Sequence, residues 1–135
     1  MSPRDVVVSQ EVVRSRKGAG RWSAIEKPRR SLATLSRVAA GRRVHGDRFL
    51  TAYYGNERGG RSLARPIGTI TTRDRWAVID HDRMRMLSVP EARRAMGFRD
   101  TYRIPDDKRL AMHMLGNAVC PPVARDLIQA IGAAA

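Results

Sequence analysis

The order of apolar and polar positions predicts helices in the second half of the chain. Ser88 precedes an apolar segment and Glu91 lies three positions further on, a capping-box pattern that starts a helix ending at Gly97. Residues 105–107, a proline and two acidic residues, start a second helix that continues to Gly116. Both segments are therefore expected to be helical.

Two further segments repeat apolar residues at helical spacing. Residues 31–43 predict a short basic helix, and the prolines at 121–122 start the last helix of the chain. Residues 1–20 mix polar and basic side chains with one short apolar run, which predicts a poorly ordered segment or an edge strand. The apolar stripe of the last helix consists of Val123, Leu127, Ala130 and Ile131.

Short runs of β-forming residues lie between the predicted helices. Residues 49–54 predict one strand, and a glycine-rich loop follows at 56–61. Residues 67–72 and 76–79 predict a hairpin, or two adjacent strands, joined by a charged turn at 73–75. Helices and short strands together predict the α+β class.

Length and charge favour a single domain with a nucleic-acid partner. The 135 residues include 26 Lys and Arg against 13 Asp and Glu, a net charge of +13, and all but three of the basic residues are Arg. Residues 1–50 alone hold 12 basic and 4 acidic side chains. The planar guanidinium suits phosphates and guanine edges, although a merely solvated arginine-rich surface gives the same count.

The side chains offer no catalytic or metal-binding constellation. His45, His81 and His113 lie in separate segments without a metal-ligand spacing, and Cys120, the single cysteine, has no histidine near it in sequence. We therefore expect no metal site, and we expect Cys120 to be a small apolar residue packed at a turn. The Gly-Asn pair at 116–117 could present backbone N–H groups to a ligand, although a helix C-cap explains the same pair.

Arginine and threonine alternate in the segment after the first strand. Arginine binds phosphate or guanine, and threonine contacts phosphate, base edges or the thymine methyl group. This composition is therefore typical of a DNA-binding segment, although the polar face of a hairpin would have the same composition. The residues are Arg58, Arg61, Arg65, Thr69, Thr71, Thr72, Arg73 and Arg75.

Two segments in the last third resemble conserved motifs of the DNA cytosine-5 methyltransferases. Residues 85–100 read RMLSVPEARRAMGFRD and are similar to the ninth motif, a basic residue, Leu, a Glu-bearing helix and then Gly-aromatic-Pro-Asp. Residues 116–124 read GNAVCPPVA and are similar to the tenth, usually Gly-Asn-small-Val-Pro-Pro-Pro-Val-Ala. Both occur in the family's order, and residues 66–75 resemble the end of its target recognition domain. The resemblance covers residues 20–132.

The chain also departs from the family pattern. Arg99 stands where the ninth motif has Pro, Cys120 where the tenth has Pro, and Met114 where Gln commonly precedes Gly-Asn. The 135 residues contain no Phe-x-Gly-x-Gly cofactor loop, no Pro-Cys-Gln nucleophile motif, no Glu-Asn-Val motif and no Gln-x-Arg-x-Arg motif. We therefore expect no catalytic residue within this sequence.

The resemblance implies an organisation and a set of site residues. It divides the chain into a poorly ordered segment 1–20, a target-recognition-like region 21–84 and a helical segment 85–135, whose helices normally pack on a Rossmann-like domain absent from these residues. Around an extruded cytosine, the implied DNA contacts are Tyr54, Gly55, Thr69, Ile70, Thr71, Arg73 and Arg75. The implied contacts to S-adenosyl-L-methionine are Asn117, Ala118 and Val119.

The sequence thus predicts a C-terminal fragment or split subunit of a DNA (cytosine-5) methyltransferase, inactive alone. It would read double-stranded DNA and complete the S-adenosylmethionine pocket of an N-terminal half supplied in trans, in restriction-modification or a related role. No apolar run reaches the ~20 residues of a membrane span and no signal peptide is evident, so a cytoplasmic, nucleoid-associated protein is expected. A non-catalytic DNA-binding module and a non-functional remnant with an exposed apolar stripe stay open as alternatives.

Overall fold

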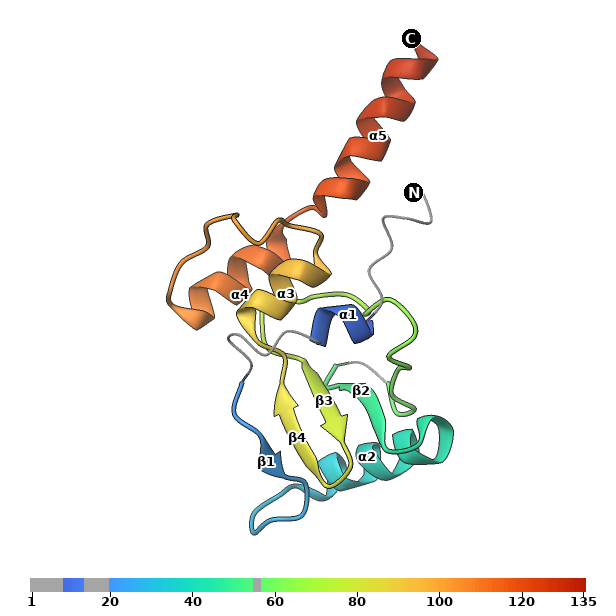
Figure 1. The fold of residues 1–135 in the computed structure, drawn as a ribbon, viewed down its shortest axis with the longest axis vertical. Coiled ribbons are helices and arrows are strands. Elements are labelled where there is room, and N and C mark those ends of the chain that lie inside the picture. The colour runs from blue at the N-terminus through green and yellow to red at the C-terminus, as the bar shows by residue number, and fades with distance from the viewer. Residues whose placement is uncertain (1–8, 14–19, 55–56) are drawn as a thin grey trace.

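A four-stranded antiparallel sheet lies at the centre of the computed structural model (Figure 1), which describes residues 9–13, 20–54 and 57–135. The strand order across the sheet is β1-β4-β3-β2. The α+β class is confirmed, and the described residues contain no Rossmann-like domain. The elements are α1 (Ser9–Val13), β1 (Ser23–Ala24), α2 (Leu32–His45), β2 (Arg48–Ala52), β3 (Trp76–Asp80), β4 (Arg83–Met86), α3 (Val89–Ala95), α4 (Lys108–Asn117) and α5 (Pro121–Ala134).

Helices cover both faces of this sheet. On one face, Leu50 of β2 packs in a core with residues of α1, α3 and α4, among them Leu115. On the other face, Phe49 packs with Ile79 of β3 and Val38 of α2. Consecutive strand residues point to opposite faces, so a strand covered on both sides needs apolar residues throughout. Accordingly, the four residues of β2 after Arg48 are all buried.

The residues predicted to start and end α3 and to start α4 do so in the structure. The Ser88 hydroxyl accepts from the backbone N–H of Glu91, and the Glu91 carboxylate accepts from the N–H of Ser88 at 2.8 Å, which completes the capping box of α3. Gly97 follows α3 in a left-handed conformation with φ of 80°. The Asp107 carboxylate caps α4 by accepting from the N–H of Leu110 at 2.7 Å. The four predicted helices are thus confirmed, with bounds shifted by a few residues.

The predicted hairpin between residues 67–72 and 76–79 is wrong. β3 pairs with β2 along one edge and with β4 along the other, so no edge remains for residues 67–72. This segment instead crosses the core as a loop, in which Ile70 is only 6% exposed. The carbonyl of Thr69 accepts a hydrogen bond from Nε1 of Trp76 at 3.0 Å, which ties the loop to β3.

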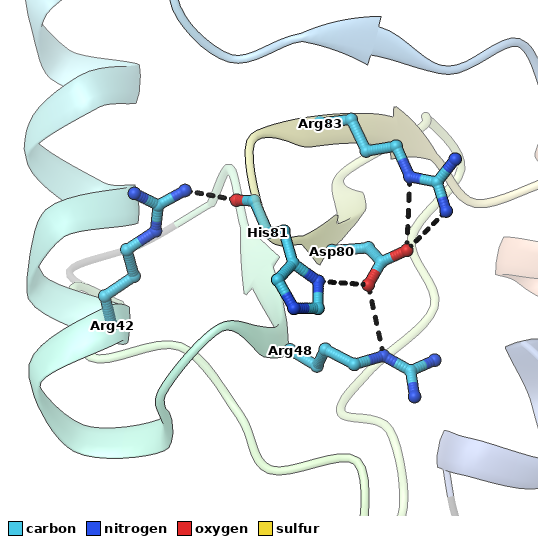
Figure 2. Close-up of polar contacts among 5 residues, drawn as sticks. All are labelled: Arg42, Arg48, Asp80, His81 and Arg83. Carbon is cyan, nitrogen blue, oxygen red and sulfur yellow. Dashed lines mark hydrogen bonds and ion pairs between the residues drawn. The ribbon is translucent and has the colours of Figure 1, made fainter.

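One carboxylate joins the ends of three strands (Figure 2). Asp80 ends β3 and accepts a 2.7 Å bond from Arg83 of β4, and it lies 3.3 Å from Nε of Arg48 on β2. His81, in the β3–β4 turn, contacts the same carboxylate at 3.0 Å, and its carbonyl accepts from Arg42 of α2. The hydrogen bonds from Arg83 and then from His81 hold the pKa of Asp80 below its usual value. This carboxylate therefore stays charged at neutral pH.

The segment predicted to be poorly ordered or an edge strand contributes a short helix to the core. Residues 9–13 form α1, in which Val12 is fully buried, and the N–H of Gln10 donates to the carbonyl of Leu63 at 2.8 Å. The apolar run at 6–8 lies outside the described residues. The predicted boundary between residues 84 and 85 falls inside β4, so the regions on either side of it share one sheet.

The last helix stands apart from the core. Figure 1 shows α5 extending away from the sheet and the other helices, and none of its residues is buried. Its predicted apolar stripe is confirmed as a surface feature, since Leu127 is 59% exposed and Ile131 is 71% exposed. Apolar surface of this kind, continuous along a helix, is typical of an interface.

Candidate functional site

A basic hollow lies where β2 ends and β3 begins. It has a volume of about 410 Å³, which is within the range of ligand sites. Four of the seven residues predicted to contact DNA meet there, namely Tyr54, Thr71, Arg73 and Arg75. We call it the β2–β3 hollow, and its lining consists of Tyr53, Tyr54, Thr71, Thr72, Arg73 and Arg75.

Strand pairing fixes the position of the arginines in this hollow. The N–H of Tyr53 donates to the carbonyl of Arg75 at 2.7 Å, and the Arg75 guanidinium donates back to the carbonyl of Tyr53 at 3.1 Å. The Thr71 hydroxyl donates to the carbonyl of Arg73 at 2.9 Å and closes a tight turn. The Arg73 side chain is exposed. The two guanidinium groups are therefore presented from a backbone that is held in place.

Tyr54 supplies an aromatic wall with a polar tip. Its ring meets Trp76 edge to face, with ring centroids 5.7 Å apart. Burial raises the pKa of the Tyr54 hydroxyl above its usual value, and the negative charge of Glu57 adds to this, while the positive charge of Arg61 opposes it. The phenol is therefore neutral at physiological pH and can both donate and accept a hydrogen bond.

Two other predicted DNA contacts, Thr69 and Ile70, do not line this hollow. Thr69 is exposed, but its carbonyl is occupied by the bond to Trp76 described above. The side chain of Ile70 packs in the core with Leu50 and Leu115, where it supports the loop. Gly55 lies outside the described residues.

The three predicted cofactor contacts follow one another at the end of α4. Asn117 is exposed, and its Nδ2 lies 3.2 Å from Nε2 of His113 one turn earlier. Ala118 is half-buried against the core, and its N–H donates to the carbonyl of Leu115 at 3.2 Å. Val119 is 65% exposed. The segment thus offers an amide and a small apolar surface from a rigid helix end.

Gly116 brings the predicted cofactor residues next to the predicted DNA residues. A Cβ at this position would lie 2.3 Å from the backbone nitrogen of Thr72 and 2.4 Å from the carbonyl carbon of Thr71. Neither distance is possible for a real side chain, so the last turn of α4 touches the 71–72 backbone only because residue 116 is glycine. Close approach to this loop, not a helix C-cap, is the structural role of Gly116.

A buried ion pair joins Arg85 of β4 to Glu91 of α3, and the sequence did not reveal it. Both side chains of the Arg85–Glu91 pair are almost inaccessible, at 3% and 1% exposure, and they are joined by two bonds of 2.7 and 2.6 Å. Ser88 adds bonds to the same carboxylate from its N–H at 2.8 Å and its hydroxyl at 3.0 Å. The guanidinium of Arg85 lies 4.9 Å from the ring centroid of Trp22. Glu91 therefore has two roles, as the cap of α3 and as the partner of Arg85.

The described residues offer no metal-binding cluster and no membrane-spanning helix. The described residues contain no group of three or more His, Cys, Asp or Glu side chains that could hold a metal ion. Cys120 is half-buried against the core with its Sγ 3.8 Å from Sδ of Met96, which confirms it as a packed turn residue. None of the helices in the described ranges has the length and apolar character needed to cross a membrane.

The fold is an α+β chain in which α1, α3 and α4 pack on β2 and β3 in one core, and a basic hollow lies where β2 ends and β3 begins. The chain belongs to the C-5 cytosine-specific DNA methylase family, whose family model matches residues 8–133. Neither a curated protein nor a solved structure matches the chain. The resemblance seen in the sequence is thus confirmed at the level of the family, which ties the protein to DNA methylation.

Proposed function

We propose that this chain supplies the DNA-reading surface and one wall of the S-adenosylmethionine pocket of a DNA (cytosine-5) methyltransferase. The catalytic cysteine and the glycine-rich cofactor loop would come from outside these 135 residues. The observation that carries the proposal is the contact of Gly116, the residue before Asn117, with the 71–72 backbone. A methyl donor and its target base must meet, and this contact holds their predicted contact residues together.

The chemistry of the β2–β3 hollow suits a nucleotide. Its two arginines carry positive charge for phosphate or guanine edges, and Tyr54 offers an aromatic face with a neutral hydroxyl. A base taken out of the stack needs stacking partners and hydrogen bonds to its edge. Such a set of residues favours binding of DNA near an extruded cytosine.

The residues at the end of α4 fit a partial cofactor site. Asn117 and Val119 are exposed, and Ala118 is small, so an amide and an apolar surface stand open for a ligand with polar and apolar ends. Bound S-adenosylmethionine would supply the methyl group. These three residues would form one wall, and the opposite wall would belong to the catalytic domain.

The exposed stripe of α5 is the surface that this domain would cover. Val123, Leu127 and Ile131 are 41%, 59% and 71% exposed along one face of the helix. At about 25 cal/mol per Å², full burial of a fully exposed apolar side chain gives roughly 1.5–3 kcal/mol, and each of these side chains would gain the share that its exposed surface represents. The stripe is therefore strong enough to anchor α5 on a partner domain.

A methyl-transfer assay tests the proposal. The chain is incubated with duplex DNA and labelled S-adenosylmethionine, with and without the N-terminal half of a cytosine-5 methyltransferase. We expect incorporation only when both are present. Robust C5 methylation by the 135-residue chain alone would refute the proposal. It would also be refuted if the chain did not bind DNA and no N-terminal half gave incorporation with it.

Variants of α5 sharpen this assay. Leu127→Asp places a charge in the stripe and is expected to abolish complementation, because the charge would be buried in the interface. Gln129→Asp introduces the same charge on another face of the same exposed helix and should leave complementation intact. Neither residue is buried, so both variants should fold like the parent chain. Equal loss in both would argue against docking through the stripe.

A further inference from the structure

Basic residues of α2 line a second hollow, whose lining contains none of the residues predicted to contact DNA. The buried residues of α2 are Thr34, Val38 and Gly41, and none of its 14 residues is acidic. A cavity of about 300 Å³ lies between another face of α2 and the loop after β2. We call it the α2 hollow, and its lining consists of Ala33, Ser36, Arg37, Ala40, Arg43 and Arg58.

Small residues and arginines divide the lining of the α2 hollow. Ala33, Ser36 and Ala40 recur at helical spacing, so their short side chains leave room beside the helix. Three guanidinium groups complete the lining, which includes no carboxylate. A cavity of this composition favours an anion that can accept several hydrogen bonds at once.

Arg37 is held in place, whereas the guanidinium groups of the other two arginines have no partner among the described residues. Nη1 of Arg37 donates to the carbonyl of Ala52 at 3.0 Å, and its guanidinium lies 5.4 Å from the ring centroid of Tyr53. Within the described part of the chain, no hydrogen bond or ion pair engages Arg43 or Arg58. A guanidinium has five N–H donors, so most of the donors in this hollow await an acceptor.

The α2 hollow adjoins the β2–β3 hollow through one residue. Tyr53 carries the Arg37 guanidinium on its ring and also lines the β2–β3 hollow beside Arg75. Arginines therefore continue from the predicted base contacts across the end of β2 to α2. Such continuity fits a strand of nucleic acid, whose phosphates repeat along its length.

We propose that the α2 hollow binds a backbone phosphate of the DNA whose bases are read at the β2–β3 hollow. The proposal rests on the DNA-reading function proposed above and adds a contact that positions the duplex without reading its sequence. It gives a role to Arg43 and Arg58, which lie outside the segment that resembles the end of the target recognition domain.

Salt-dependent binding of a fluorescent DNA duplex to the full chain tests this assignment. In the double variant Arg43→Gln with Arg58→Gln, we expect the slope of log K against log salt to become shallower by about 0.9, the value for one phosphate contact. That slope corresponds to roughly eightfold weaker binding at 0.1 M salt. The loss should be the same for two duplexes of unrelated sequence, because a phosphate carries no sequence information.

A charge-matched variant controls for net charge. Arg99→Gln with Arg103→Gln also removes two exposed positive charges, from a cavity beside α5 rather than beside α2. We expect its affinity for DNA to stay within about twofold of the parent value and its salt slope to stay within about 0.3 of the parent slope. Both changes are much smaller than the loss of one phosphate contact would cause. Thermal unfolding of both variants checks that they fold.

The outcomes separate this proposal from the function on which it rests. If the parent chain binds DNA and the α2 variant matches it, or if the control loses as much, the phosphate site is refuted while DNA reading stands. If the parent chain does not bind duplex DNA, the DNA-reading function itself fails. Tighter binding of the parent to duplex RNA of the same sequence would overturn the assignment to DNA.

Discussion

Replacing Glu91 by glutamine should unfold the chain far more readily than a single charge change on a surface would. In the native state, Glu91 receives two bonds from Arg85, at 2.7 and 2.6 Å, and two from Ser88, at 2.8 and 3.0 Å. Glutamine keeps one acceptor oxygen but turns an NH₂ group toward a guanidinium, which only donates. The Arg85 charge would then stay buried without a counter-ion.

The magnitude follows from the burial of the pair. Breaking a buried ion pair by neutralising one partner costs about 3–5 kcal/mol. Among the described residues, Nε of Arg85 already has no partner, so the site holds no spare acceptor for the orphaned charge. Glutamine is accepted in a capping box, so the cap of α3 is retained and we expect a loss of about 3–4 kcal/mol. Arg85→Met alone should cost a similar amount, because it leaves Glu91 without its cation.

A double-mutant cycle isolates the pair. Urea unfolding monitored by circular dichroism gives the free energy of unfolding of the parent, the two single variants and Arg85→Met with Glu91→Gln. We expect the double variant to lose only about 1 kcal/mol, because neither an unpaired charge nor a cavity remains. Arg94 lies on the same helix as Glu91 and pairs at the surface with Asp100, which follows that helix, so Arg94→Met should change stability by less than about 0.5 kcal/mol. Additive losses in the double variant would refute this account.

Three further perturbations address other contacts. Gly116→Ala should lower the free energy of unfolding by about 2–3 kcal/mol, because its Cβ would overlap backbone atoms. In the control Gly132→Ala the new Cβ meets nothing within 4 Å, so this variant should stabilise α5 slightly or leave stability unchanged. Equal effects of the two substitutions would contradict the close contact at Gly116. Asp80→Asn should lower the free energy of unfolding by about 0.5–1 kcal/mol at pH 7. Because the pKa of Asp80 in the folded state lies below its ordinary value of 3.8, the difference in stability from the parent should persist down to about pH 3.8 and vanish as pH falls through the folded-state pKa. A difference that stays constant down to pH 2 would mean that charge is not its origin. Arg73→Ala with Arg75→Ala should weaken duplex binding by about 60-fold at 0.1 M salt if each contacts one phosphate, and unchanged binding measured by fluorescence anisotropy would remove the β2–β3 hollow from the DNA interface.

Local signals made the helices predictable. Ser88 and Asp107 cap their helices through hydrogen bonds to residues three positions further on. Each capping signal therefore lies within a few consecutive residues and can be recognised in the sequence alone. Glycine after α3 and the prolines before α5 are equally local. The same holds for the resemblance to the family's ninth and tenth motifs, since each of the two similar segments is a single stretch of chain.

Features that depend on pairing between distant segments could not be predicted from the sequence. Residues 67–72 have the composition of a strand, but β4, a basic segment from Arg83 to Met86, takes the edge of β3 that they would need. Burial of Arg85 was equally hidden, because an arginine is almost always exposed unless a partner is placed by the fold. The β2–β3 hollow also joins residues some twenty positions apart, which only the sheet brings together.

The contact at Gly116 limits how parts of such chains can be exchanged. If the loop before β3 reads DNA as proposed, a corresponding loop grafted from another family member keeps its contact with α4 only when its backbone follows the same path at 71–72, within the space that the missing Cβ of Gly116 leaves. Grafts confined to residues 57–70 preserve that path, whereas a crossover between residues 72 and 116 joins surfaces that were shaped separately. Changes of sequence specificity are therefore expected to succeed upstream of this contact, with Gly116 and its two neighbours in the loop inherited as a unit.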